Sequence, residues 1–126
     1  MNERQRIFGV PIPGTADNLF VPGVGCVNGC RFCSTSHFFG KTYTPFLKTG
    51  HAMFREACRI ADARGPDCFF VMDENFLKDR ERAMDLLAEM EKHQRWFQFR
   101  GFSSAEAIQV FGLDNLVRLG MDLVWI

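Results

Sequence analysis

Short apolar runs alternate with longer amphipathic stretches along the chain, and this pattern predicts the order of its strands and helices. A short continuous apolar run between turn residues is typical of a strand that is buried on both faces of a sheet. The first such run is the least regular, because Pro22 and Gly23 interrupt it. The runs predict four strands, at residues 19–24, 68–72, 96–102 and 121–126.

Between these runs the apolar residues recur with the period of a helix. In residues 51–64 they stand at positions i, i+3, i+4 and i+7, which form one helix face: Phe54, Ala57, Cys58 and Ala61. Residues 79–93 carry a second stripe, formed by Ala83, Leu86, Leu87 and Met90. Ser103 and Glu106 have the spacing of a capping box with Ser103 as the N-cap, and they predict a third helical region that runs to Leu119.

The alternation of strands and helices favours an α/β fold with right-handed crossovers and a parallel sheet. Residues 35–49, punctuated by glycine and proline, are expected to be a loop. A closed α/β barrel typically needs about 200 residues or more, and residues 121–126 end the chain on a bare apolar strand. We therefore expect a partial (β/α) barrel with parallel strands, in which residues 1–18 are an irregular lead-in and residues 19–126 form the partial core domain.

Charge and composition narrow the classes of function. Lys plus Arg and Asp plus Glu both number 15, so no basic excess points to nucleic acid or to an anionic membrane. No apolar run is long enough to span a bilayer, and the first residues lack the apolar core of a signal peptide. Five cysteines, an odd number, argue against a disulfide framework and predict a reducing, cytoplasmic setting. Two of them, Cys58 and Cys68, are expected to be buried apolar residues.

The other three cysteines, Cys26, Cys30 and Cys33, follow the first predicted strand with the spacing C-x3-C-x2-C. Iron–sulfur clusters are usually held by four thiolates, and closed structural zinc sites also have four ligands. A loop that offers three thiolates therefore leaves one coordination position open, which favours chemistry at the metal. A zinc loop or free thiols are the alternatives, although His37 and His51 lack the spacing of zinc ligands.

Two further polar segments follow predicted strands. Asp73, Glu74 and Asn75 come directly after the second strand, and residues 100–104 lie at the end of the third. The carboxyl ends of parallel strands meet at one edge of a sheet, and ligands bind there in α/β folds. We therefore expect both segments to converge with the cysteine loop.

Each of these residues also has a purely structural interpretation. Asp73 and Glu74 could be an acidic pair at a helix start, where the helix dipole favours negative charge. Arg100 could pair with a carboxylate, and for Ser103 a capping role is favoured over contact with a ligand. The charged residues 78–82 are expected to form a solvated face.

The cysteine motif, with Phe32 directly before its last cysteine, resembles the signature of the radical S-adenosylmethionine (radical SAM) family. The strings GCVNGCRFCSTSHFFGKTY and VMDENFLKDRERAMDLLAEME are similar to the branch whose full-length members often carry a cobalamin-binding domain before the barrel. The resemblance covers about residues 21–126 and implies roughly half of a radical SAM barrel. We expect no cobalamin-binding domain within this chain.

The resemblance also implies a set of ligands. Cys26, Cys30 and Cys33 would each bind one iron of a 4Fe–4S cluster, and the amino and carboxylate groups of S-adenosylmethionine would chelate the fourth iron. One electron from the reduced cluster would cleave the sulfonium to methionine and a 5′-deoxyadenosyl radical, which abstracts hydrogen from a substrate. The other implied contacts to S-adenosylmethionine are Phe32 with the adenine, Asp73, Glu74 and Asn75 with the methionine amino group, and Arg100, Ser103 and Ser104 with the carboxylate or ribose.

Two hypotheses follow. In the first, the chain is a truncated radical SAM protein that binds the cluster and S-adenosylmethionine for reductive cleavage, with an electron donor such as a flavodoxin or ferredoxin and an unknown small-molecule substrate. In the second, it is a non-catalytic iron–sulfur or zinc-binding module that needs a partner chain to complete its barrel. Whether the isolated chain catalyses a reaction is left open at this point, and neither hypothesis involves nucleic acid or a membrane.

Overall fold

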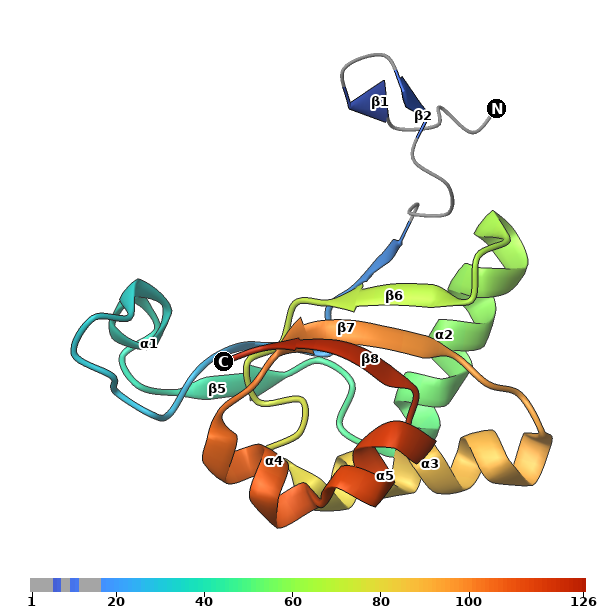
Figure 1. Ribbon diagram of the computed structural model, residues 1–126. Coiled ribbons are helices and arrows are strands. Elements are labelled where there is room, and N and C mark those ends of the chain that lie inside the picture. The colour runs from blue at the N-terminus through green and yellow to red at the C-terminus, as the bar shows by residue number, and fades with distance from the viewer. Residues whose placement is uncertain (1–5, 8–9, 12–16) are drawn as a thin grey trace.

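Figure 1 shows the computed structural model, which describes residues 6–7, 10–11 and 17–126. Its centre is a parallel sheet of four strands in the order β3-β6-β7-β8. These strands are β3 (Asn18–Phe20), β6 (Cys68–Val71), β7 (Gln98–Phe102) and β8 (Met121–Trp125). The predicted α/β fold with a parallel sheet is therefore confirmed.

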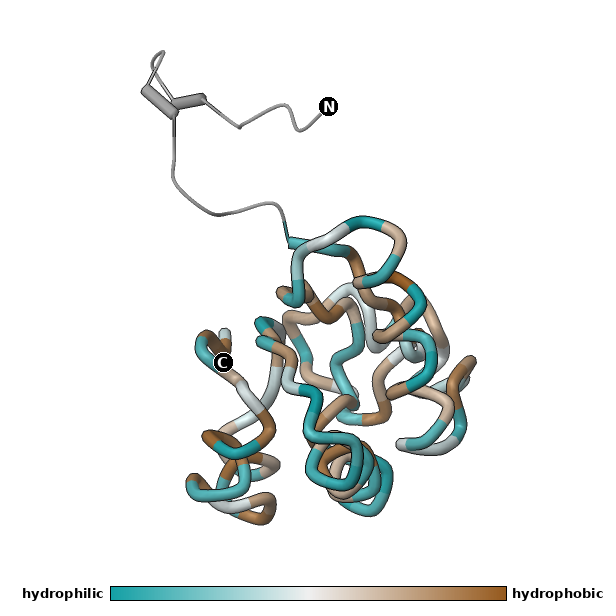
Figure 2. The backbone as a smooth tube through the Cα atoms, turned by 90° about the vertical axis from the view of Figure 1, so that its right-hand side faces the viewer, coloured by the Kyte–Doolittle hydropathy of each residue, from teal (hydrophilic) through white to brown (hydrophobic). Residues whose placement is uncertain are grey.

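Helices connect the strands of this sheet (Figure 1). They are α2 (Gly50–Arg64) before β6, α3 (Arg80–His93) between β6 and β7, and α4 (Ala105–Phe111) with α5 (Leu113–Arg118) between β7 and β8. Apolar and polar residues are interspersed along the helical segments in Figure 2, as amphipathic helices require. Within the described residues, no helix has both the length and the apolar character needed to cross a membrane.

Local sequence explains where the two long helices begin and where α2 ends. The side chains of Thr49 and Asp79 accept hydrogen bonds from backbone N–H groups in the first turns of α2 and α3. At the end of α2, Gly65 has a φ of 99°, a left-handed conformation that glycine adopts without steric cost. The predicted limits of both helices are therefore correct to within one residue.

The third helical region does not begin where the capping-box spacing predicted. Ser104 is the N-cap of α4, and its hydroxyl oxygen accepts a hydrogen bond from the backbone N of Ala107 at 3.2 Å. Ser103 instead donates its backbone N–H to the carbonyl oxygen of Trp125 at 2.9 Å, which continues the pairing of β7 with β8. Glu106 consequently occupies the second helical position, not the third. Strand pairing therefore decides which of two adjacent serines caps the helix.

One face of the sheet carries the apolar core. Its buried side chains are Phe20, Phe69, Val71, Phe99 and Met121. The ring centroids of Phe20, Phe69 and Phe99 lie between 5.5 and 6.2 Å apart across three strands. The predicted helix stripes pack against them, because Phe54, Ala57, Ala61, Ala83, Leu86, Leu87 and Met90 are all buried in this core.

The opposite face of the sheet is not covered by any of the residues that the structure describes. Leu19 is 58% exposed, and Phe102 and Trp125 are also exposed. Near the carboxyl end of this face, the rings of Phe70, Phe102 and Trp125 contact one another with centroids 5.5–5.8 Å apart. A parallel sheet with helices on one face is consistent with a partial β/α fold.

The predicted first strand over residues 19–24 is in fact two strands in different sheets. β3 ends at Phe20, and β4 (Gly23–Gly25) pairs antiparallel with β5 (Tyr43–Pro45). The break falls at Pro22, which cannot donate to a ladder.

The predicted loop over residues 35–49 is wrong in part, since it contains β5 and most of α1 (Ser34–Phe38). Elements of three to five residues are too short to show a hydrophobic period. In the predicted irregular lead-in, β1 (Arg6–Ile7) and β2 (Val10–Pro11) form a short antiparallel pair. The other residues of the lead-in up to residue 16 lie outside the described residues.

Candidate functional site

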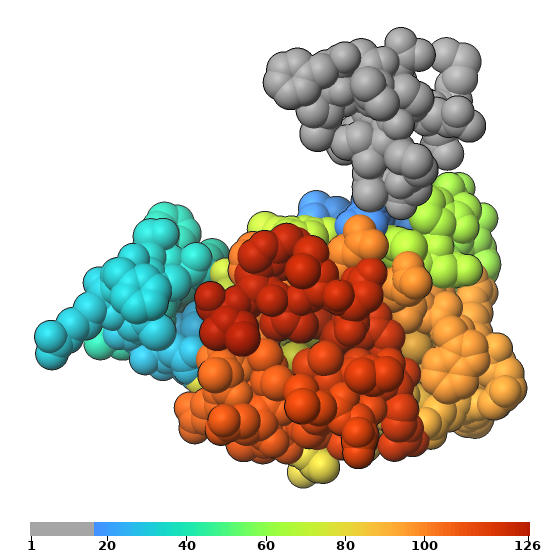
Figure 3. Space-filling view, in the orientation of Figure 1, coloured from blue at the N-terminus to red at the C-terminus, as the bar shows by residue number. Residues whose placement is uncertain are grey.

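The three clustered cysteines lie in a long loop between two paired strands. Gly25 at the end of β4 is paired with Tyr43 at the start of β5, so residues 26–42 form one connection between them. This connection, which we call the cysteine lobe, contains the cysteines and α1. In Figure 3 it projects, in cyan, from the rest of the molecule.

The lobe presents three free thiols with different exposure. Cys26 is 5% exposed, whereas Cys30 and Cys33 are partly exposed, and the backbone N of Cys33 donates to the carbonyl oxygen of Cys30 at 3.1 Å. Among residues 17–126, no three Cys, His, Asp or Glu side chains are positioned so that they could jointly hold a metal ion. The three thiols thus lie on one loop, but their sulfur atoms are not gathered around a common point.

Ser36 braces the cysteine loop from within. Its side chain is almost completely buried, and its hydroxyl donates to the carbonyl oxygen of Cys26 at 2.8 Å while accepting from the backbone N of Gly29 at 2.8 Å. A ring nitrogen of His37 also lies 3.1 Å from the carbonyl oxygen of Cys30. Sequence reasoning missed Ser36, because nothing in its local pattern distinguishes it from Ser34.

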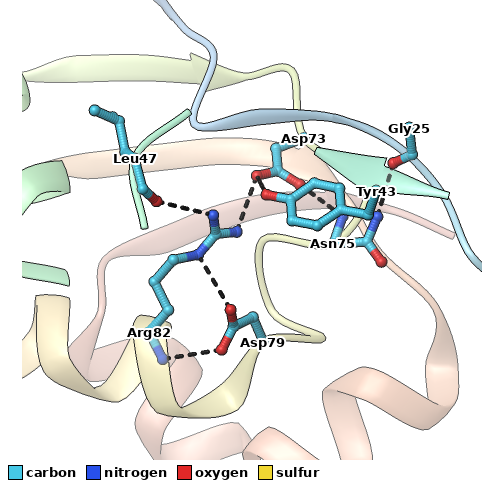
Figure 4. Close-up of polar contacts among 7 residues, drawn as sticks. All are labelled: Gly25, Tyr43, Leu47, Asp73, Asn75, Asp79 and Arg82. Atoms are coloured by element: carbon cyan, nitrogen blue, oxygen red, sulfur yellow. Dashed lines mark hydrogen bonds and ion pairs between the residues drawn. The ribbon is translucent and has the colours of Figure 1, made fainter. Parts of the chain in front are cut away.

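The segment after β6 holds both strands at the base of the lobe, as the close-up in Figure 4 shows. The side-chain amide of Asn75 donates to the carbonyl oxygen of Gly25 on β4 at 2.8 Å. The Tyr43 hydroxyl on β5 donates to Asp73 Oδ2 at 2.6 Å. The predicted convergence is therefore confirmed for the base of the cysteine lobe and the segment after β6. For residues 100–104 it stays a prediction.

A buried arginine completes this network. Arg82 Nη2 donates to Asp73 Oδ2 at 3.0 Å, and Nη1 donates to the carbonyl oxygen of Leu47 at 3.1 Å. The Arg82 guanidinium also lies 5.4 Å from the ring centroid of Tyr43, within range of a cation–π contact. The predicted solvated face over residues 78–82 is therefore wrong at Arg82, whose side chain is buried. Burial, followed by the hydrogen bond to Asp73, raises the pKa of Tyr43 above its ordinary value.

The three polar residues after β6 differ in how their side chains are used. Asp73 Oδ1 accepts from the backbone N of Asn75 at 2.8 Å, and Asp73 Oδ2 accepts from Tyr43 and Arg82, so both carboxylate oxygens are engaged. Asn75 is committed to the base of the lobe through its NH₂ group. Glu74 is partly buried, and no hydrogen bond or ion pair of its carboxylate occurs within residues 17–126.

Arg100 is held away from the cysteine lobe. It is paired with Asp122 at 2.9 Å and with Asp17 at 3.3 Å, so its predicted alternative role as a salt-bridge partner is confirmed. In the register of the sheet, Leu19 on β3 is level with Phe70 on β6 and with Arg100 on β7. Asp17 precedes Leu19 by two residues, so it lies toward the amino ends of the strands. A contact between Arg100 and S-adenosylmethionine stays a prediction, and the guanidinium already meets two carboxylates.

The remaining predicted contacts lie in two different parts of the structure. Ser103 and Ser104 follow β7, where they join strand pairing and cap α4. Phe32 is 94% exposed on the cysteine lobe. Outside the lobe, Cys58 and Cys68 are partly buried rather than fully buried, and burial raises the pKa of both thiols.

Comparison with known proteins adds two partial similarities. No protein-family model matches the chain, and no solved structure matches it. A cytidylyl-2-hydroxyethylphosphonate methyltransferase from Streptomyces wedmorensis is 32% identical over 62 residues, which cover 49% of this chain and 11% of that protein. A hopanoid C-2 methylase from Rhodopseudomonas palustris (strain TIE-1) is 29% identical over 83 residues, which cover 66% of this chain and 15% of that protein. The similarity thus extends over roughly half or more of this chain, which matches only a small part of each relative's length, and both relatives are named as enzymes that add methyl groups.

Proposed function

We propose that the chain forms the first half of a radical SAM core, in which Cys26, Cys30 and Cys33 bind a 4Fe–4S cluster and S-adenosylmethionine binds beside it. The observation that carries the proposal is the cysteine lobe itself, which bears three free thiols and is bonded at its base to the segment after β6. When bound, the cluster supplies the electron for reductive cleavage of S-adenosylmethionine. The partial similarity to two methylating enzymes supports a role of the whole protein in methyl transfer.

The charge of the cysteine lobe suits an anionic cluster. The sequence contains no Asp or Glu between Asp17 and Glu56, whereas Arg31 and Lys41 lie within the lobe. A Cβ added to Gly29 would lie 3.2 Å from Cδ and Cε of Lys41, so the stem of this cation crosses the cysteine loop. The two cations, on a stretch of chain without carboxylates, complement the negative charge of a cluster that is held by three thiolates.

Among the residues predicted to meet the methionine amino group, Glu74 is the one we assign to it. An ammonium group needs acceptors that are not already used. The carboxylate oxygens of Asp73 are engaged by Tyr43, Arg82 and the backbone, but the Glu74 carboxylate has no such partner among the described residues. The exposed ring of Phe32 is available to pack against the adenine.

Anaerobic reconstitution with iron and sulfide tests the metal site. The wild-type chain is expected to turn brown and to contain iron and acid-labile sulfide, and Cys30→Ala is expected to lose both. Cys58→Ala is the matched control, because Cys58 lies on α2, outside the cysteine lobe, and should leave the cluster intact. A colourless protein, or one that contains zinc without sulfide, would contradict the proposal and support the alternative of a zinc module.

A second measurement separates a catalytic core from a module that only binds the cluster. Dithionite replaces the physiological electron donor, and formation of methionine from S-adenosylmethionine is followed by chromatography. Cleavage by the isolated chain is expected if residues 17–126 contain enough of the site. A cluster that forms and never cleaves S-adenosylmethionine would instead support the non-catalytic alternative, in which a partner chain has to complete the barrel.

A further inference from the structure

We propose that Tyr43 and Asn75 are positioning residues that hold the cysteine lobe in a defined orientation against the sheet. The inference rests on the proposed function, because it names the residues that hold the loop proposed to bind the cluster. Tyr43 reaches from β5 to Asp73, and Asn75 reaches back to Gly25 on β4, so each strand at the base of the lobe has its own side-chain bond to one short segment. Cys26 directly follows the residue that Asn75 holds.

The lobe depends on these bonds because the strands beneath it are weak supports. β4 and β5 have three residues each and form a separate two-stranded sheet, and an isolated hairpin is only marginally stable in water. Beyond the ladder between them, the backbone N–H groups of Phe46 and Leu47 donate to the carbonyl oxygen of Pro22. These bonds join the two ends of the hairpin to each other. The hydrogen bonds of Tyr43 and Asn75 instead connect the hairpin to the segment that follows β6.

Close packing directs the Tyr43 hydroxyl toward its acceptor. A Cβ on Gly23 would lie 2.2 Å from the Tyr43 hydroxyl oxygen, so the absence of a side chain at Gly23 makes room for the phenol. Arg82 orients the acceptor from the other side, since it donates to the same oxygen of Asp73. A continuous line of contacts therefore runs from α3 through Asp73 to the base of the lobe.

In this arrangement the three consecutive residues Asp73, Glu74 and Asn75 have different roles. Asp73 and Asn75 hold the lobe, and Glu74 between them has a carboxylate that no side chain or backbone group of residues 17–126 engages. Because Asp73 and Asn75 are also linked through the backbone N–H of Asn75, the position of Glu74 is set by the same bonds that set the position of the cysteines. Loosening the base is therefore expected to affect the cluster, whereas removing the Glu74 charge is expected to affect only the binding of S-adenosylmethionine.

Hydrogen exchange in the full chain without a cluster tests the positioning role. Tyr43→Phe and Asn75→Ala are each expected to speed the exchange of hydrogen-bonded amides in β4, β5 and the cysteine lobe about fivefold, the effect of losing one net hydrogen bond. Amides in α2 serve as the internal reference and should not change. Unchanged exchange in the lobe, or equal acceleration in α2, would overturn the inference.

Glu74→Gln is the matched control. It should leave exchange in the lobe at the wild-type rate and weaken the binding of S-adenosylmethionine to the reconstituted protein, whereas Tyr43→Phe and Asn75→Ala should release iron to a chelator faster than wild type. If Tyr43→Phe and Asn75→Ala both released iron at the wild-type rate, this result would count against the positioning role of Tyr43 and Asn75. If wild-type protein takes up no cluster, the proposed function fails, and the exchange experiment still decides whether Tyr43 and Asn75 hold the lobe.

Discussion

The Arg82 guanidinium donates to the Asp73 carboxylate at 3.0 Å, and the two side chains are 1% and 0% exposed. Two buried charges are stable together only if their attraction and their hydrogen bonds offset the loss of hydration. Here Tyr43 and the backbone N of Asn75 satisfy further lone pairs of the carboxylate. Among the residues that the structure describes, the buried Arg82 Nε has no hydrogen-bond partner and lies 3.7 Å from Asp79 Oδ2. The stability of the buried pair therefore depends mainly on the contact between Arg82 and Asp73.

Removing the arginine alone should therefore destabilise the fold strongly. Arg82→Met leaves the Asp73 carboxylate buried without its counter-charge, and we expect a loss of about 3–5 kcal/mol in the free energy of unfolding, measured by urea denaturation. Arg80→Met, at an exposed position of the same helix turn, should cost less than about 0.5 kcal/mol. Similar losses in the two variants would contradict a buried ion pair.

The single tyrosine of the chain allows a direct titration. The pKa of Tyr43 is raised by burial and by its hydrogen bond to Asp73, so the folded state binds the phenolic proton more tightly than the unfolded state does. The resulting stability is fully present below the unfolded pKa of about 10 and is lost as the pH rises above it. We expect the ultraviolet band of phenolate to appear only well above pH 10 or together with unfolding. Appearance of the band near pH 10 in folded protein would contradict the burial of this hydroxyl, and Tyr43→Phe should remove the band altogether.

Gly50 is required where α2 crosses α3. A Cβ at this position would lie 2.1 Å from the backbone N of Leu86, so Gly50→Ala has to push two helices apart. We expect a loss of about 3 kcal/mol in urea denaturation, at the upper end of the cost of overpacking. Gly40→Ala is the control, because a Cβ there meets nothing within 4 Å and only the left-handed φ of 63° disfavours alanine, at a cost of about 1 kcal/mol. Equal losses in the two variants would contradict a steric cost at the contact between α2 and α3.

Ser36→Ala tests the brace inside the cysteine lobe. The variant removes the hydroxyl that joins the Cys26 carbonyl to the Gly29 N–H, and it leaves both groups without this partner. We expect a cost of about 1–3 kcal/mol in the free energy of unfolding, the usual range for buried polar groups left unsatisfied. Ser34→Ala, at an exposed position of the same helix, is expected to change stability by less than about 0.5 kcal/mol. Equal, small changes in the free energy of unfolding of the two variants would contradict a stabilising role of the Ser36 hydroxyl.

Local pattern predicted the long elements well and the short ones poorly. The stripes that contain Ala57 and Leu86 predicted α2 and α3, because many buried contacts favour one helix face. The strand predicted through Pro22 was wrong, since three-residue strands such as β4 are specified by their pairing partner rather than by a period of their own. The capping site moved from Ser103 to Ser104 for a similar reason, as pairing with β8 uses the backbone of Ser103.

The sequence by itself determined the order of the main-sheet strands and the long helices, and the spacing of the three cysteines, because hydrophobic period and motif spacing are local properties. Only the tertiary structure decided which polar residues are used internally: Arg82 is buried against Asp73, Asn75 holds Gly25, and Glu74 keeps a carboxylate without a partner among the described residues. The bond from Asn75 to Gly25 spans 50 positions of the chain, and the bond from Tyr43 to Asp73 spans 30. Hydrogen bonds and burial at such separations depend on how the sheet, the helices and the cysteine lobe pack together, which no local pattern records.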